Sequence, residues 1–264
     1  MGTPSEGFGL KIMASRLGNC ITELTQCYCD TTQAGLSSSM AFKQSSKTRL
    51  TRRDLGRFPS ETLFDRIARV VCDVGCLPRK ELYEAWEMAR RTRRLFRGGR
   101  VVDLGGGHGL LAHMMLLLDN TSPCALVVDR ALPLSAEKLH RALRRAWPRL
   151  DRVEFLAVGA DHVELTTDDI VVSSHACGRL TDVVLDRASA AGGRVGVLPC
   201  CHDLEACDTG DLAGWVDGAL AIDIVRATRL QAKGYRVWTL AIPEVITPKN
   251  RLLLAAPSAR PTSP

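Results

Sequence analysis

From residue 99 onward, short apolar segments alternate with longer amphipathic ones, and this alternation limits the possible folds more than any other feature of the chain. The apolar segments cover residues 100–104, 126–128, 153–158, 170–173, 194–198, 235–240 and 251–255. Apolar runs of this length between helical patterns predict a mostly parallel α/β sheet with helices on both faces. No helical pattern separates the last two runs, so we expect them to form an antiparallel hairpin at the edge of the sheet.

A glycine-rich turn follows the first predicted strand, with the sequence VVDLGGGHG at residues 101–109. Ligands of such sheets bind outside the carboxyl ends of the strands. Gly105, Gly107 and Gly109 let the backbone approach a ligand and turn into a helix whose amino-terminal amides face it. A pyrophosphate cradle has no use for the carboxylate of Asp103, whereas the cationic sulfonium and amino-acid group of S-adenosylmethionine does. The turn therefore indicates an S-adenosylmethionine site.

Two more carboxylates follow the next two predicted strands. Asp129 lies 26 residues beyond Asp103 and can accept hydrogen bonds from both hydroxyls of a ribose. Asp161 follows the third strand and is a candidate contact for the adenine amino group. One such carboxylate alone is commonly a helix N-cap or part of a solvated turn. Three of them at successive strand ends predict a cofactor site.

With these residues, segment 100–256 resembles the class I S-adenosylmethionine-dependent methyltransferases. Two further motifs, HACGRLTD at 175–182 and CCH at 200–202, resemble those of one subgroup. That subgroup includes eukaryotic tRNA acceptor-stem 2′-O-methyltransferases and the methyltransferase domains of glutathione S-transferase C-terminal-domain-containing proteins, but this chain lacks the zinc-finger spacing of the tRNA enzymes. The resemblance implies a Rossmann-like seven-stranded sheet with an antiparallel last strand, S-adenosylmethionine as cofactor, and methyl transfer as the activity.

Cysteine and histidine side chains follow the fourth and fifth predicted strands. These strands are neighbours in such a sheet, so His175, Cys177, Cys200, Cys201 and His202 should converge beside the methyl group. Three interpretations are open, with His175, Cys177 and Cys200 as the catalytic candidates. The thiols could line a tight pocket in which His175 orients the acceptor, or Cys200 could attack a pyrimidine at C6. We predict no metal, because adjacent cysteines on extended backbone point in opposite directions and no Cys-x-x-Cys frames them.

Basic residues suggest an anionic partner. The chain has a net charge of +6. The second predicted helix ends in an arginine cluster of Arg90, Arg91, Arg93, Arg94 and Arg97. A later predicted helix carries Arg141, Arg144 and Arg145. We predict that the acceptor is RNA, either tRNA or rRNA, met alone or within a ribonucleoprotein. The alternatives are a solvated basic face with a protein or small-molecule acceptor, and a catalytically inactive scaffold. No apolar run approaches the length of a membrane span, and no membrane partner is expected.

The remaining segments are expected to flank or cap this domain. We expect residues 1–54 to form a flexible basic tail and residues 55–98 to form a helical cap. We expect the methyltransferase domain at residues 99–257 and a short tail at residues 258–264. No acidic residue lies between Asp30 and Asp54, as in an organelle transit peptide, although Glu6 and Glu23 precede that stretch. The ten cysteines do not form the framework of a secreted protein. We expect a cytoplasmic protein, with import into a mitochondrion or plastid as the alternative.

Overall fold

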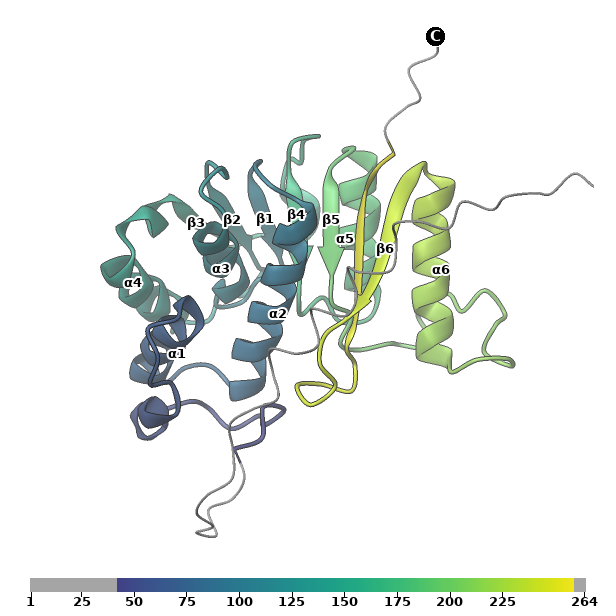
Figure 1. Ribbon diagram of the computed structural model, residues 1–264. Coiled ribbons are helices and arrows are strands. Elements are labelled where there is room, and N and C mark those ends of the chain that lie inside the picture. The colour runs from purple at the N-terminus through teal and green to yellow at the C-terminus, as the bar shows by residue number, and fades with distance from the viewer. Residues whose placement is uncertain (1–41, 259–264) are drawn as a thin grey trace, which may run out of the picture. The chain divides into compact units, whose positions relative to one another are not determined.

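The computed structural model describes residues 42–258, and residues 1–41 and 259–264 lie outside the described part. A seven-stranded sheet with the strand order β3-β2-β1-β4-β5-β7-β6 forms its centre (Figure 1). The strands are β1 Val101–Leu104, β2 Ala125–Val128, β3 Val153–Leu156, β4 Ile170–Ser173, β5 Arg194–Val197, β6 Tyr235–Ala241 and β7 Arg251–Pro257. The strands from β1 to β5 are parallel, and β7 lies antiparallel between β5 and β6. The predicted Rossmann-like sheet with an antiparallel last strand is confirmed.

Helices cover both faces of this sheet. They are α1 Leu63–Val74, α2 Arg79–Leu95, α3 Leu110–Leu118, α4 Ala136–Ala146, α5 Arg179–Ala190 and α6 Gly218–Ala232. Side chains of β1 alternate between two buried clusters: Val101 packs with α2 and α3, and Val102 packs with α5. The alternation follows from the two-residue period of a strand, so both faces of β1 must be apolar.

The predicted helical cap belongs to the α2–α3 face of the sheet. Helix α2 packs along α3, and α1 packs against α4. Helix α1 begins after Thr62, whose hydroxyl accepts a hydrogen bond from the Asp65 amide, and it ends at Gly75 with a positive φ of 71°. The cap therefore forms one wall above the carboxyl ends of the strands.

The predicted boundary of the basic tail at residue 54 is too late in the chain. Leu50 is fully buried, and its amide donates to the carbonyl of Leu77 at 2.9 Å. Phe42 packs edge-on against Phe58, with the ring centroids 6.1 Å apart. Residues 42–54 therefore pack against the cap, because their few apolar side chains occupy its core. The rest of the predicted tail, with the candidate transit peptide, lies outside the described residues.

The described part of the chain contains no helix that is long and apolar enough to cross a membrane.

Candidate functional site

A cavity of about 740 Å³ lies at the carboxyl ends of β1, β2 and β4. The glycine-rich turn forms its floor, and the residues after β2 and β4 form its sides. Leu77 and the α2 residues Glu81 and Ala85 line it from the cap. Such a volume is typical of a site for a cofactor-sized ligand.

Hydrogen bonds hold the glycine-rich turn against β2. The amides of Gly105 and Gly106 both donate to the carbonyl of Val128, at 2.8 and 3.1 Å. Gly105 and Gly107 line the cavity with positive φ angles of 70° and 51°, which glycine adopts without strain. Gly109 is the N-cap of α3, and a Cβ there would lie 2.8 Å from Val127. All three predicted glycines therefore shape the turn, although Gly109 acts from behind the cavity wall.

Asp129 lies at the end of β2 and lines the cavity. One of its carboxylate oxygens accepts from the Gly107 amide at 3.1 Å, and the other accepts from the Ala131 amide at 3.1 Å. Each carboxylate oxygen can accept more than one hydrogen bond, so both retain capacity for ribose hydroxyls. The space into which a Cβ on Gly107 would point is open. A fixed carboxylate beside such an open glycine turn fits an adenosyl cofactor.

Asp103 lies beneath the glycine-rich turn and not on the cavity wall. Its side chain is 1% exposed, and a Cβ on Gly106 would lie 2.8 Å from its Cγ. The backbone of Ala112 lies within hydrogen-bond reach of the carboxyl group, but it lowers the pKa of Asp103 less than burial raises it. Burial raises the pKa of Asp103 to about 7, and the nearby charge of Asp129 adds to the rise. The strand turns this side chain inward below the turn, so Asp103 does not line the cavity, and its direct contact with the cationic part of the cofactor stays a prediction.

Asp161 follows β3 at the outer rim of the cavity. Its side chain is largely exposed and lies 3.8 Å from Arg130 and 3.2 Å from His162. A hydrogen bond from its own backbone amide to its carboxylate, together with the charge of His162, lowers the pKa of Asp161. Asp161 is therefore an ionised acceptor at the rim, and its contact with adenine stays a prediction.

His175 follows β4 and lines the cavity. Burial, together with the charges of Lys80 and His108, lowers the pKa of His175 to about 4. Its imidazole is therefore neutral at pH 7. A neutral imidazole has one nitrogen that accepts a hydrogen bond from an acceptor hydroxyl or amine.

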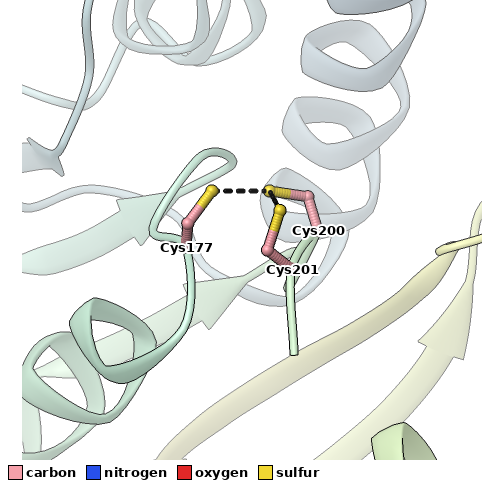
Figure 2. Close-up of side chains that lie close together, drawn as sticks. All are labelled: Cys177, Cys200 and Cys201. Carbon is pink, nitrogen blue, oxygen red and sulfur yellow. Dashed lines mark hydrogen bonds between the residues drawn. The ribbon is translucent and has the colours of Figure 1, made fainter. Parts of the chain in front are cut away.

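The three thiols of Cys177, Cys200 and Cys201 lie close together, as Figure 2 shows. The Sγ of Cys200 lies 3.3 Å from that of Cys177 and 3.8 Å from that of Cys201. The side chains of the two adjacent cysteines do not point in opposite directions. The physical reason for predicting no metal is therefore wrong. Strand β5 already ends at Val197, so the backbone at 200–201 is a loop and lacks the alternation of a strand.

His202 does not join this group. Its Nε2 lies 2.9 Å from an oxygen of Asp223, and its side chain is 4% exposed. Asp223 also accepts from Arg251 at 2.7 Å. His202 thus anchors α6 and the start of β7 to the loop after β5, because Asp223 belongs to α6.

Burial raises the pKa of the Cys200 thiol, and its two thiol neighbours raise it further. A nucleophile must be a thiolate, so Cys200 has the wrong protonation state for attack on a pyrimidine. The pKa of Cys201 is lowered by its hydrogen bond with Cys177 and by Lys249 and Lys80. This pattern disfavours the nucleophile interpretation of Cys200.

The second half of the HACGRLTD motif is structural. The hydroxyl of Thr181 donates to the carbonyl of Ala176. Asp182 accepts two hydrogen bonds from Arg226, each at 2.9 Å, and the Arg226 side chain is 1% exposed. Arg226 also donates to the carbonyl of Gly178 at 3.1 Å, so the pair fixes the loop that carries Cys177.

Most of the arginines predicted to bind RNA make ion pairs within the protein. Arg93 is buried beside Asp119 at 3.1 Å, and it also donates to Ser122 at 2.8 Å. Arg90 and Arg91 both pair with Glu87 on the same helix. This end of α2 leads into β1, at the amino edge of the sheet, whereas the cavity lies at the carboxyl edge. The α2 cluster therefore stabilises the fold and does not border the site.

Comparisons with known proteins identify the type of domain. Residues 80–207, from α2 to the loop after β5, match a family model described as a methyltransferase domain. No curated protein matches the chain in sequence. The prediction of an enzyme with a methyltransferase domain that uses S-adenosylmethionine is confirmed.

Three similar solved structures are an O-methyltransferase family protein from Burkholderia thailandensis, the mitomycin 7-O-methyltransferase MmcR and the pyocyanin biosynthetic protein PhzM. Each is 18% identical to this chain, with TM-scores of 0.42, 0.45 and 0.43. The alignments cover 78%, 79% and 79% of this chain and 68%, 64% and 62% of those proteins. The chain thus spans less than two thirds of the length of the last two.

Proposed function

We propose that this methyltransferase acts on a small acceptor molecule, which enters the cavity beside His175. The supporting observation is the cavity itself, which runs from the glycine-rich turn to His175 and is lined on the cap side by Glu81 and Ala85 of α2. Its volume of about 740 Å³ lies in the range of sites that hold small molecules.

The residues divide the work between cofactor and acceptor. S-adenosylmethionine supplies an electrophilic methyl group. Asp129 would hold its ribose, while Gly105 and Gly107 let the backbone lie against it. His175 would accept a hydrogen bond from the acceptor and direct its lone pair at the methyl group. In-line transfer depends mainly on such alignment, and a neutral His175 supplies it without a competing charge.

RNA is the second candidate acceptor. Arg141, Arg144 and Arg145 of α4 border a shallow depression together with Pro148 and Asp151. Arg141 and Arg144 pair with Glu137 and Asp151. Exposed arginines on one helix favour phosphate contact, which would make binding fall steeply with salt.

The test is transfer of an isotope-labelled methyl group from S-adenosylmethionine to separated pools of small metabolites, RNA and protein. The pools come from cells that lack the gene, so that unmodified acceptors accumulate. We expect label in the small-metabolite pool, with a His175→Ala variant that transfers at least about tenfold more slowly yet binds S-adenosylhomocysteine normally. Label in RNA alone, lost in an Arg141→Gln, Arg144→Gln, Arg145→Gln variant, would establish the second candidate instead. Normal cofactor binding without transfer to any pool would indicate an inactive scaffold.

A further inference from the structure

Cys177, Cys200 and Cys201 have the arrangement of a metal-binding cluster. Their Sγ atoms all lie within 4.8 Å of one another, and two of the separations are 3.3 and 3.8 Å. Figure 2 shows the three side chains converging from two loops, one after β4 and one after β5. Cys177 and Cys201 are exposed, so an ion can reach the cluster from solvent.

The separations agree with those of a zinc thiolate site. A Zn²⁺ ion binds thiolate sulfur at about 2.3 Å, and tetrahedral geometry then separates neighbouring sulfurs by about 3.8 Å. A trigonal arrangement of the same three bonds gives about 4.0 Å. Shifts of a few tenths of an ångström to one ångström in the exposed thiols would therefore bring all three sulfurs to one ion.

The two loops are already fixed to each other before any ion binds. The amide of Gly178 donates to the carbonyl of Cys201 at 3.0 Å, and the amide of Leu198 donates to the carbonyl of Ser173 at 3.0 Å. The ion pair of Arg226 with Asp182 holds the same region from behind. Because the ligands come from two loops held in this way, binding would cost little chain entropy.

Nearby charges suit an anionic metal complex. Three thiolates around Zn²⁺ carry a net charge of −1, and Lys249 and Lys80 both act on Cys201 as positive charges. His202 is not among the residues whose ligand atoms lie within 4.8 Å of one another, so it is not part of the cluster. Within residues 42–258 the cluster contains the three cysteines and no further side chain that could ligate an ion.

We propose that Cys177, Cys200 and Cys201 bind one Zn²⁺ ion as thiolates and leave its fourth position to water or another small ligand. Each thiol releases its proton to solvent as its bond to zinc forms. Three protein ligands and one open position are the pattern of reactive zinc sites, whereas structural sites use four. The ligand Cys177 follows His175, which lines the cavity, by two residues in the chain.

The test uses the full chain, kept reduced, stripped with a chelator and then titrated with Zn²⁺ against a chromophoric chelator. A parallel titration with Co²⁺ reports sulfur ligands through charge-transfer absorption. Cys20, Cys27 and Cys29 lie outside the described residues, so a variant with serine at all three positions is the starting protein. Cys124→Ser serves as a matched control. Cys124 is a free cysteine that lies just before the amino end of β2, whereas the three clustered cysteines follow the carboxyl ends of β4 and β5.

We expect one equivalent of Zn²⁺ per chain in the starting protein and in the Cys124→Ser variant. Cys177→Ser and Cys201→Ser should each weaken binding at least about a hundredfold, since the remaining two thiolates hold the ion poorly. Circular dichroism of both variants should stay native, because both residues are exposed. The proposal is overturned if the starting protein binds no zinc, or if these two variants bind it as tightly as Cys124→Ser does.

Discussion

Replacing the buried Asp103 with asparagine should remove a specific pH dependence of stability. The carboxyl is 1% exposed, and its pKa rises from 3.8 to about 7 on folding. Between these two values the folded protein holds a proton that the unfolded chain has released. Stability is therefore fully present below the unfolded pKa and is lost as the pH rises toward the folded pKa of about 7.

The size of the effect follows from the shift. Each pH unit in this window changes the free energy of unfolding by about 1.4 kcal/mol per proton. From pH 5 to pH 8 the contribution of Asp103 to the free energy of unfolding then falls by about 2–3 kcal/mol, because the group is almost fully ionised at the upper value. The Asp103→Asn variant keeps the shape but cannot titrate.

The assay is urea unfolding of both proteins without cofactor at pH 5 and pH 8. Between pH 5 and pH 8 the free energy of unfolding of the wild type should fall by about 2–3 kcal/mol more than that of the variant. His113 and His175, whose pKa values are lowered to about 4, change stability in the opposite direction. Both are present in the two proteins, so their contribution cancels in the comparison. An equal pH dependence in wild type and variant would refute the assignment of a raised pKa to Asp103.

Two further substitutions test the packing around the site. Gly106→Ala would place a Cβ 2.8 Å from side-chain atoms of Asp103 and Val127. We expect it to lower the free energy of unfolding by about 1–3 kcal/mol and to weaken S-adenosylhomocysteine binding at least about tenfold. Gly214→Ala is the control and should change neither quantity, because the space around Gly214 is open. Arg226→Met would leave the carboxylates of Asp182 and Asp223 without their buried partner, so chemical denaturation should show a free energy of unfolding lower by about 3–5 kcal/mol. Arg229→Met removes only an exposed ion pair and should change this free energy by less than about 1 kcal/mol.

The layers of the fold could be predicted from the sequence because parallel strands are apolar on both faces. Val101 and Val102 pack into different clusters, so the short apolar segment around these two valines was a sufficient signal for β1. Asp129, which lines the cavity, was equally visible, since it directly follows the apolar run of β2. Both features depend on residues that are close together in the chain.

Features that depend on distant segments could not be predicted in this way. Glu81 lines the cavity only because the cap packs over the strand ends, and its own helix pattern gives no sign of that contact. Arg226 pairs with Asp182 across 44 residues, and nothing local distinguishes it from a surface arginine. Asp103 was identified as a site residue, but its depth below Gly106 depends on how the turn folds over it.

Calorimetric titration of the protein with S-adenosylhomocysteine tests most directly whether the cavity at the ends of β1 and β2 is the cofactor site. Asp129 lines this cavity and is held by the Gly107 amide at 3.1 Å. We predict one binding event of about micromolar affinity in wild type, weakened at least about tenfold in Asp129→Ala, with unchanged affinity in Asp208→Ala, which alters an exposed carboxylate outside the cavity. Binding of equal strength in wild type and a folded Asp129→Ala variant would contradict this placement of the cofactor.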